Sequence, residues 1–405
     1  MAFRISKNEK VNFATPQEMF QDNKMKNIFG LIDYQSKTID NYMKTIKQDG
    51  SIINKHVAFE LPTGSGKTLI GLLIAEFHRK KFHRKALFLC PTNQLVMQVC
   101  KQAKDQYGIE TIAFCGKQAE YEPKNKSDFI LSKKIGVTTY SSFFATSKYF
   151  DATDIIIFDD VHSSENYIAE NWSINIQKDQ NEILYNELTE VINETVGDSF
   201  YSRMIAENPQ DGDIAEWCNM LPMPMIYEKL DEIRDIISAN VRETSLNYAW
   251  SQISDHLGEC NIFVSWDSIL IRPYIIPTLT FPPFKNAKQC VFMSATLGKS
   301  GELERITGVD KIKFLPMVSD LDMKGIGRKY FVFPDLSFSE SMHKNLIINL
   351  HHLSKKSIVI VPNNNEQDTL IEFVNSESPN TKTFKADDLK NLRDDFDSSP
   401  DANIT

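Results

Sequence analysis

Four residues of this sequence have the types and the order needed to hold a nucleoside triphosphate with a magnesium ion. Lys67 and Thr68 follow a glycine-containing loop, and Asp159 and Asp160 come much later in the chain. A lysine ammonium can pair with the β- and γ-phosphates, and a threonine hydroxyl can ligate Mg²⁺. One carboxylate can hold the ion through water while the other orients the attacking water. The sequence therefore predicts a site for ATP and Mg²⁺.

The segment around Lys67 has the pattern of a strand, a loop and a helix. The apolar run 57–59 precedes the loop, and the apolar run 69–75 follows it. Gly64 and Gly66 allow the loop to turn its N–H groups inward, toward phosphate oxygens at the positive end of the helix. The common phosphate-loop pattern begins with a glycine where this chain has Leu61. An ordinary glycine-rich turn is the alternative, but it leaves Lys67 and Thr68 unexplained. The predicted ATP-binding loop consists of Pro62, Thr63, Gly64, Ser65, Gly66, Lys67 and Thr68.

The carboxylates lie at the end of a second predicted strand. Residues 155–158 are all apolar, as in a buried parallel strand. The carboxyl end of such a strand faces the phosphates, so Asp159 would hold Mg²⁺ and Asp160 would act as the general base. His162 would relay the state of the nucleotide to the rest of the molecule. A strand followed by an acidic turn is common, but the upstream loop favours the functional interpretation.

Composition limits the remaining possibilities. The 405 residues are enough for two or three domains, and 41% hydrophobic and 24% charged residues are typical of a globular protein. The net charge of −9 gives no global basic field, so a nucleic-acid partner would need a local groove. No membrane span or secretion signal is evident, which predicts a cytoplasmic or nuclear protein. The six cysteines form no Cys-x-x-Cys pair, and we expect reduced thiols.

Several short motifs together resemble those of superfamily 2 helicases. Asp-Asp-Val-His resembles the Asp-Glu-Ala-His box, and the other motifs follow in the family's order. They are Tyr34–Gln35, Leu89–Met97, Ile135–Tyr140, Met293–Leu297 and Ser357–Pro362. The resemblance implies an α/β fold in which a RecA-like P-loop NTPase motor domain is followed by the start of a second RecA-like domain.

The resemblance also implies roles for individual residues. Gln35 would recognise the adenine edge. Ser294 and Thr296 would couple ATP hydrolysis to strand movement. The residues expected to contact nucleic acid are Thr92, Thr139 and Tyr140.

Three features resemble the XPD/DinG branch of these helicases. They are the form of the loop that begins at Glu60, the Ser-Glu-Asn sequence at 164–166, and Arg272-Pro273. Members of that branch often carry an iron–sulfur cluster, which requires four clustered thiolates. Cys90, Cys100 and Cys115 are widely spaced in the sequence, and we predict no cluster. The resemblance favours DNA over RNA as the substrate.

The segment 163–260 is expected to be a helical, arch-like insertion in the first domain. Apolar residues recur at helical spacing in two stretches, 184–192 and 230–241. The insertion could gate a single strand, dock a partner protein, or only pack against the motor. Its aromatic residues are expected mainly in the core.

We expect a first domain at 1–324 and an incomplete second domain at 325–405. The 78 residues from Arg328 onward are short for a domain, and Arg393 has acidic neighbours that would make it a poor arginine finger. A missing finger would lower the hydrolysis rate by ~10³–10⁵. Asp160 also has a shorter side chain than the usual glutamate. The chain could be a piece of a longer helicase or could be completed by a partner subunit. We therefore predict an ATP-dependent helicase or translocase, with an ATP-binding switch of low turnover as the alternative.

Overall fold

The computed structural model describes residues 13–145, 148–207, 217–298 and 301–318, and then 333, 339–354, 356–361, 363–385, 395–396, 398–400 and 402–404. The chain divides into two compact units, Met1–Ile326 and Gly327–Thr405. Arg328 and Arg393 lie outside the described residues. Among the described helices, none is long and apolar enough to cross a membrane.

A seven-stranded parallel sheet forms the centre of the first unit. From edge to edge the strands are β11 (Lys313–Phe314), β1 (His56–Glu60), β10 (Gln289–Ser294), β5 (Ile155–Asp159), β2 (Ala86–Cys90), β4 (Ile135–Thr139) and β3 (Thr111–Phe114). The central strands are almost fully buried, as expected for a parallel sheet that is covered on both faces. Because all strands are parallel, their carboxyl ends meet at one edge, where β1, β10 and β5 are neighbours.

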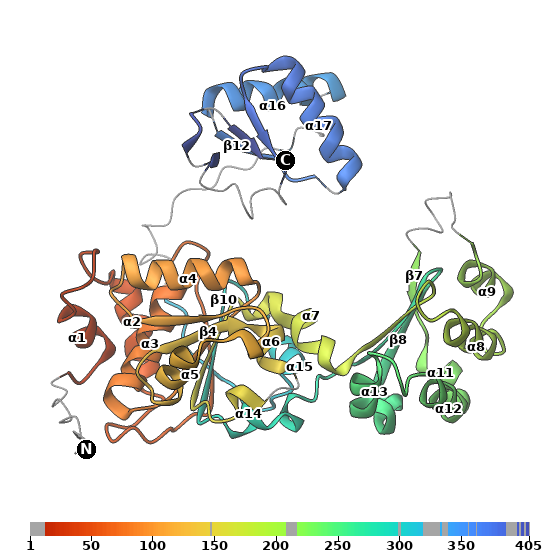
Figure 1. The fold of residues 1–405 in the computed structure, drawn as a ribbon, viewed down its shortest axis with the longest axis horizontal. Helices are drawn as coiled ribbons and strands as arrows, with labels where there is room; N and C mark the ends of the chain where they lie inside the picture. Colours follow the sequence, from red (N-terminus) through yellow and green to blue (C-terminus); the bar gives the residue numbers. More distant parts are fainter. Residues whose placement is uncertain are drawn as a thin grey trace. The chain divides into compact units, whose positions relative to one another are not determined.

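Helices cover both faces of this sheet (Figure 1). Successive residues of β1 alternate between two hydrophobic clusters: Val57 and Phe59 belong to one, and Ala58 to the other. The helices that contribute to the first cluster are α1 (Pro16–Gln21), α2 (Asp33–Met43), α3 (Lys67–Phe82) and α4 (Asn93–Asp105). The second cluster contains residues of α5 (Pro123–Ile130), α6 (Tyr140–Phe144), α7 (Glu165–Ala169), α14 (Pro282–Asn286) and α15 (Glu302–Thr307), together with helices between residues 182 and 253. Short 3₁₀ helices are η1 (Gln118–Glu120), η2 (Lys148–Phe150), η3 (Val161–Ser164), η4 (Glu170–Trp172) and η7 (Thr278–Thr280).

The segment between β5 and β10 contains the insertion, and it is not purely helical. The two expected helical stretches form α8 (Glu182–Asn193) and α12 (Leu230–Asn240). With α9 (Asp198–Met204), α11 (Met223–Ile226), α13 (Asn247–Ile253), η5 (Tyr227–Lys229) and η6 (Ser254–Glu259), they accompany an antiparallel sheet (Figure 1). Its strand order is β6 (Ile174–Gln177), β9 (Ser268–Pro273), β8 (Cys260–Ser265) and β7 (Cys218–Met220).

The expectation of a helical insertion ending at residue 260 therefore needs correction. Strands β8 and β9 continue the inserted sheet to Pro273, and β6 pairs with β9. The physical reason is alternating burial: Ile262 and Val264, then Ile269 and Ile271, point to the core while their neighbours are more exposed. That two-residue period is the signature of a half-buried strand rather than of a helix.

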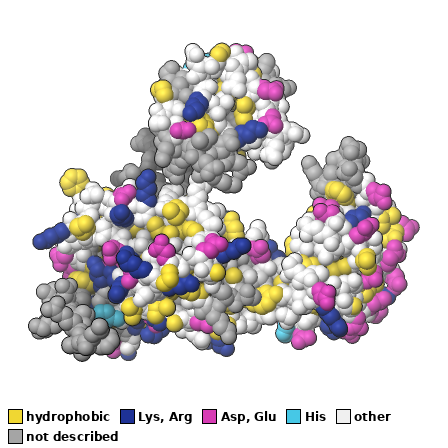
Figure 2. Space-filling model, viewed as in Figure 1, with side chains coloured by type: hydrophobic (Ala, Val, Ile, Leu, Met, Phe, Trp, Pro, Cys, Tyr) yellow, Lys and Arg dark blue, Asp and Glu magenta, His cyan; other side chains and the backbone are white. Residues whose placement is uncertain are grey.

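The inserted segment has a distinct charge. Residues 163–273 contain 20 acidic and six basic residues, whereas the rest of the chain contains 34 acidic and 39 basic residues. Figure 2 shows many acidic side chains on the visible face of the lobe that holds α8 and α12. The net negative charge of the protein therefore comes from this segment.

The second unit contains a small parallel sheet with the strand order β12 (Lys356–Ile358), β14 (Ala402–Ile404) and β13 (Lys382–Phe384). Its described helices are α16 (Glu340–Ser354) and α17 (Asn364–Glu377). Buried His351 hydrogen-bonds Ser357 and Thr381 through its two ring nitrogens, at 2.8 and 2.9 Å. The Ser357–Pro362 motif overlaps β12 at Ser357 and Ile358, and its last residue lies outside the described residues.

Candidate nucleotide-binding site

The loop between β1 and α3 has the backbone geometry of a phosphate-binding turn. Gly64 and Gly66 have φ angles of 82° and 85°, in the left-handed region that glycine adopts most easily. Ser65 closes the turn, because its hydroxyl donates to the Pro62 carbonyl at 2.6 Å. Helix α3 begins at Lys67, so its unpaired N–H groups and positive dipole end face the loop. The loop can therefore accommodate an anionic phosphate chain.

Gln35 braces this loop from α2. Its side-chain amide donates to the Ser65 carbonyl at 2.9 Å and accepts from the Ile32 N–H at 3.1 Å. The Tyr34 hydroxyl donates to the same Ser65 carbonyl at 2.8 Å. A side chain at Gly66 would collide with the Gln35 amide. The sequence predicted a role for Gln35 toward the base, but it gave no sign of this support for the loop.

Lys67, Thr68 and Asp159 lie together beyond the carboxyl ends of the strands. The Thr68 hydroxyl is 3.4 Å from the Asp159 carboxylate, although 91 positions separate the two residues. Burial raises the pKa of Asp159 to about 6, and the negative charge of Asp160 adds to the shift while the Lys67 ammonium opposes it. A hydroxyl and a carboxylate at one point are the oxygen donors that Mg²⁺ prefers, so these residues fit the ion.

Asp160 occupies a strained position directly after β5. Its φ and ψ angles are 54° and 49°, a left-handed conformation that is uncommon for a residue other than glycine. The Ser294 hydroxyl, at the end of β10, is 3.4 Å from the Asp160 carboxylate. Glu60 makes a further link that sequence reasoning missed, since its carboxylate accepts the Leu297 N–H at 3.0 Å. The segment 294–297 is thus fastened both to Asp160 and to the end of β1.

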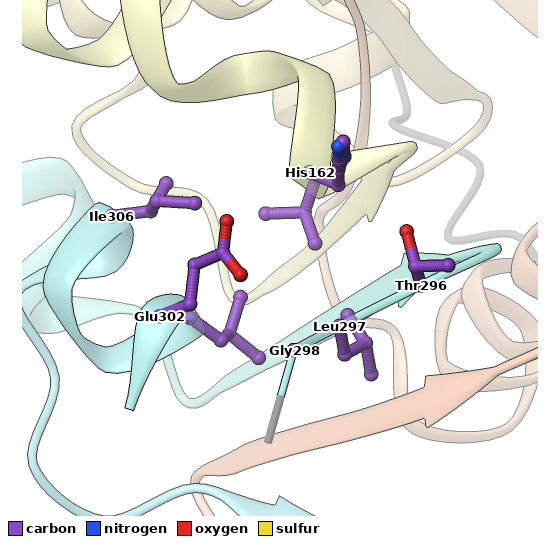
Figure 3. Close-up of a pocket in the computed structure, with 8 residues that line it drawn as sticks. His162, Thr296, Leu297, Gly298, Glu302 and Ile306 are labelled. Carbon is purple, nitrogen blue, oxygen red and sulfur yellow. The ribbon is translucent and has the colours of Figure 1, made fainter. Parts of the chain in front are cut away.

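His162 and Thr296 are exposed and line a cavity of about 130 Å³ beside this site. The other lining residues are Val161, Leu297, Gly298, Glu302, Leu303 and Ile306. Figure 3 shows His162, Thr296 and Glu302 around this cavity. The cavity lies between the Asp-Asp-Val-His segment, the Ser-Ala-Thr segment and α15.

Two of the residues expected to contact nucleic acid occupy equivalent positions at helix starts. Thr92 caps α4 by accepting the Leu95 N–H at 3.3 Å, and Thr139 caps α6 by accepting the Ser142 N–H at 3.1 Å. Thr92 lies just after β2, and Thr139 is the last residue of β4. Because these two parallel strands are paired, both threonines lie at the carboxyl edge of the sheet. Thr92 is exposed, whereas Thr139 is largely buried.

Tyr140 differs from the expectation. Its side chain is fully buried, and its hydroxyl donates to the Asp159 carbonyl at 2.7 Å. A buried ring with its hydroxyl engaged cannot stack on a base or reach a phosphate. The expected nucleic-acid contact of Tyr140 is therefore wrong, and its side chain instead supports the backbone of Asp159.

A family model and several solved structures are similar to this chain. Residues 28–189 match the family described as type III restriction enzyme, res subunit. The structure of S. tokodaii Xpd4 is 14% identical, with 92% of this chain and 80% of that chain covered and a TM-score of 0.50. An XPD helicase is 15% identical, with 93% and 80% covered and a TM-score of 0.47. Mss116p bound to ssRNA and AMP-PNP is 14% identical, with 93% and 60% covered and a TM-score of 0.45. No curated protein sequence matches the chain.

The likeness to Xpd4 confirms the expected RecA-like α/β fold, and the family match covers the phosphate loop and the Asp-Asp-Val-His segment. The family model matches residues 28–189, which is less than half of the chain, and the likeness to Xpd4 shows the fold alone.

Proposed function

We propose that this chain binds ATP with Mg²⁺ and uses its hydrolysis to move along a nucleic-acid strand. The observation that carries the proposal is the convergence of Lys67, Thr68, Asp159, Asp160 and Ser294 at the carboxyl ends of β1, β5 and β10. Strand ends in an open parallel sheet are where such folds bind their ligands.

Each residue of this cluster has a role in the proposal. Lys67 neutralises the terminal phosphates, while Thr68 and Asp159 hold the magnesium ion. Asp160 orients the attacking water. Ser294, hydrogen-bonded to Asp160, transmits the loss of the γ-phosphate to the segment that ends at Thr296, and His162 lines the cavity behind it. The proposed pocket also includes Gln35 beside the loop.

The strand is proposed to cross the carboxyl edge of the sheet near Thr92 and Thr139. Helix starts offer N–H groups and a positive dipole end to a phosphate. We favour DNA over RNA and the XPD/DinG branch, because Glu60, Arg272 and the Ser-Glu-Asn segment resemble that branch. Contacts of this kind follow the backbone, so binding should depend weakly on sequence and strongly on salt.

One observation favours a second function, an ATP-dependent switch with little turnover. Asp160 takes the place of the usual glutamate, and a carboxylate displaced by about 1 Å can cost around 10²-fold in rate. In that case ATP binding would change the affinity of the chain for a partner without sustained hydrolysis.

The test measures ATP binding and hydrolysis by the full chain with single-stranded DNA, single-stranded RNA and neither. Lys67→Ala should lower turnover by at least ~10²-fold, because an electrostatic contact to the transferring phosphate is lost. Lys104→Ala, on the exposed face of α4, is the matched control. Turnover that depends on Lys67 and rises with DNA supports the motor. Binding without stimulated turnover supports the switch, and absence of ATP binding contradicts both.

A further inference from the structure

Glu165 joins three parts of the first unit that are far apart in the sequence. Arg305, on α15, makes a two-pronged contact with the Glu165 carboxylate, with N–O distances of 2.6 and 2.8 Å. Arg272, on β9 of the inserted sheet, donates to the same carboxylate at 2.9 Å and to the Asn166 side chain at 2.9 Å. One carboxylate thus connects α7, the inserted antiparallel sheet and α15.

The link from Glu165 to the nucleotide site is short and stiff. Helix α7 begins at Glu165, directly after η3, and η3 begins directly after Asp160. The Ser163 N–H and hydroxyl both donate to the Asp160 carbonyl, at 3.0 and 2.8 Å, and the Ser164 hydroxyl donates to Val161 at 2.6 Å. A displacement of Asp160 therefore cannot be absorbed easily before it reaches Glu165.

The two arginines belong to different elements of the first unit. Arg272 lies on β9, which pairs with both β6 and β8 and so belongs to the centre of the inserted sheet. Arg305 lies on α15, whose residues Glu302, Leu303 and Ile306 form one wall of the cavity at His162 and Thr296 (Figure 3). A change in the position of Glu165 would act on both.

The contacts of Glu165 with Arg272 and Arg305 are less exposed and more directional than an ordinary surface ion pair. The Arg272, Glu165 and Arg305 side chains are only 17%, 29% and 28% exposed. A planar guanidinium that contacts both oxygens of a carboxylate fixes orientation as well as distance. Such a contact responds to rotations of the carboxylate that a single lysine contact would tolerate.

We propose that Glu165 is a positioning residue that transmits the state of the nucleotide site to the insertion through Arg272 and to α15 through Arg305. This inference rests on the proposed ATP binding. It gives the insertion a mechanical connection to the site, in addition to whatever its outer surface contacts.

Hydrogen–deuterium exchange of the full chain, with and without AMP-PNP and Mg²⁺, tests the proposal. In the wild type, nucleotide should change exchange in three places: the loop 61–68, strands β8 and β9, and α15. Glu165→Gln should keep the change in the loop and lose it in both distant places. Arg272→Gln should lose it only in β8 and β9, and Arg305→Gln only in α15. Glu170→Gln, in η4 close by and exposed, should behave as the wild type.

The outcomes separate the two proposals. If the loop 61–68 does not respond in the wild type, the proposed ATP binding fails and the coupling fails with it. If the loop responds but β8, β9 and α15 do not, or if Glu165→Gln responds as fully as the wild type, the coupling alone is overturned. Thermal melting of each variant shows whether it is folded. If Glu165→Gln is unfolded, Arg272→Gln and Arg305→Gln each test one of the two connections.

Discussion

At the scale of single residues, Asp160 combines an unusual backbone with a proposed catalytic role. Its left-handed conformation is better tolerated by asparagine than by most residues, because a short polar side chain can hydrogen-bond locally. Asp160→Asn should therefore preserve the fold while removing the base. We expect kcat to fall by about 10²–10⁴-fold with little change in the KM for ATP, the usual contribution of a general base. Steady-state kinetics and a melting curve measure both effects.

The variant to compare with Asp160→Asn is Asp160→Glu. Glutamate restores the length found in the related box, but the left-handed backbone costs it roughly 1–2 kcal/mol. A lower melting temperature with retained turnover is the expected result. Full turnover in Asp160→Asn would show that another group orients the water.

At this scale the sequence indicated which side chains lie near one another better than it indicated their surroundings. Thr68 and Asp159 were expected at one place from their types and order, and the fold brings them to within 3.4 Å of each other. Tyr140 was misplaced because a motif does not show the direction of a side chain. Tyr140 is the first residue of α6, and its ring packs against Phe158 in the core.

At the scale of elements, a buried polar network joins α2, α3 and β10. The Tyr42 hydroxyl donates to the Gln289 side chain at 2.7 Å and lies 2.6 Å from His78 Nε2. The Arg84 guanidinium lies 3.0 Å from His78 Nδ1. Burial, and then the charge of Arg84, lowers the pKa of His78 to about 3. The folded protein therefore keeps this histidine neutral.

The network makes stability dependent on pH. Between about pH 3 and 6.5 the unfolded chain binds a proton at His78 that the folded protein does not, so the free energy of unfolding falls as pH falls. The slope from this group approaches about 1.4 kcal/mol per pH unit. Burial lowers the pKa of His56 to about 4, and that residue should act in the same direction.

Urea unfolding at several pH values measures this effect. His78→Gln should be less stable than the wild type near neutral pH but should show a flatter fall toward acid. His256→Gln, at an exposed position, should leave the slope unchanged. An unchanged slope in His78→Gln would mean that another group takes up the proton.

The insertion shows where pattern reasoning about elements succeeded and where it failed. Helices α8 and α12 were predictable, because each presents a long apolar face at helical spacing. Strands β6 and β7 were not, because each is short and pairs with a strand that is distant in the sequence, and the adjacent strands β8 and β9 each have only a few alternating positions. Short strands gain their stability from pairing, which local patterns do not reveal.

At the scale of the whole molecule, charge is divided between the insertion and the rest of the chain. The acidic segment 163–273 would repel a phosphate backbone, whereas the remaining residues carry a small positive excess. This distribution argues against the insertion as a gate that binds a single strand, and it leaves the proposed backbone contacts to the rest of the chain. Affinity for nucleic acid should then fall with rising salt, with a slope set by cations outside the insertion.

Neutralising acidic residues of the insertion tests this division. Glu182, Glu228 and Asp235 are exposed on α8, η5 and α12. A variant with Glu182→Gln, Glu228→Gln and Asp235→Asn should bind single-stranded DNA as tightly as the wild type or a few-fold more tightly at low salt. The difference should vanish as the Debye length shrinks to about 3 Å near 1 M salt. Since any gain at low salt is lost at high salt, log affinity should fall with log salt as steeply as in the wild type or slightly more steeply. Fluorescence anisotropy over a salt series measures affinity and slope together. A variant that binds more weakly than the wild type would show that the acidic segment contributes contacts to the strand, and the division of charge would then need another explanation.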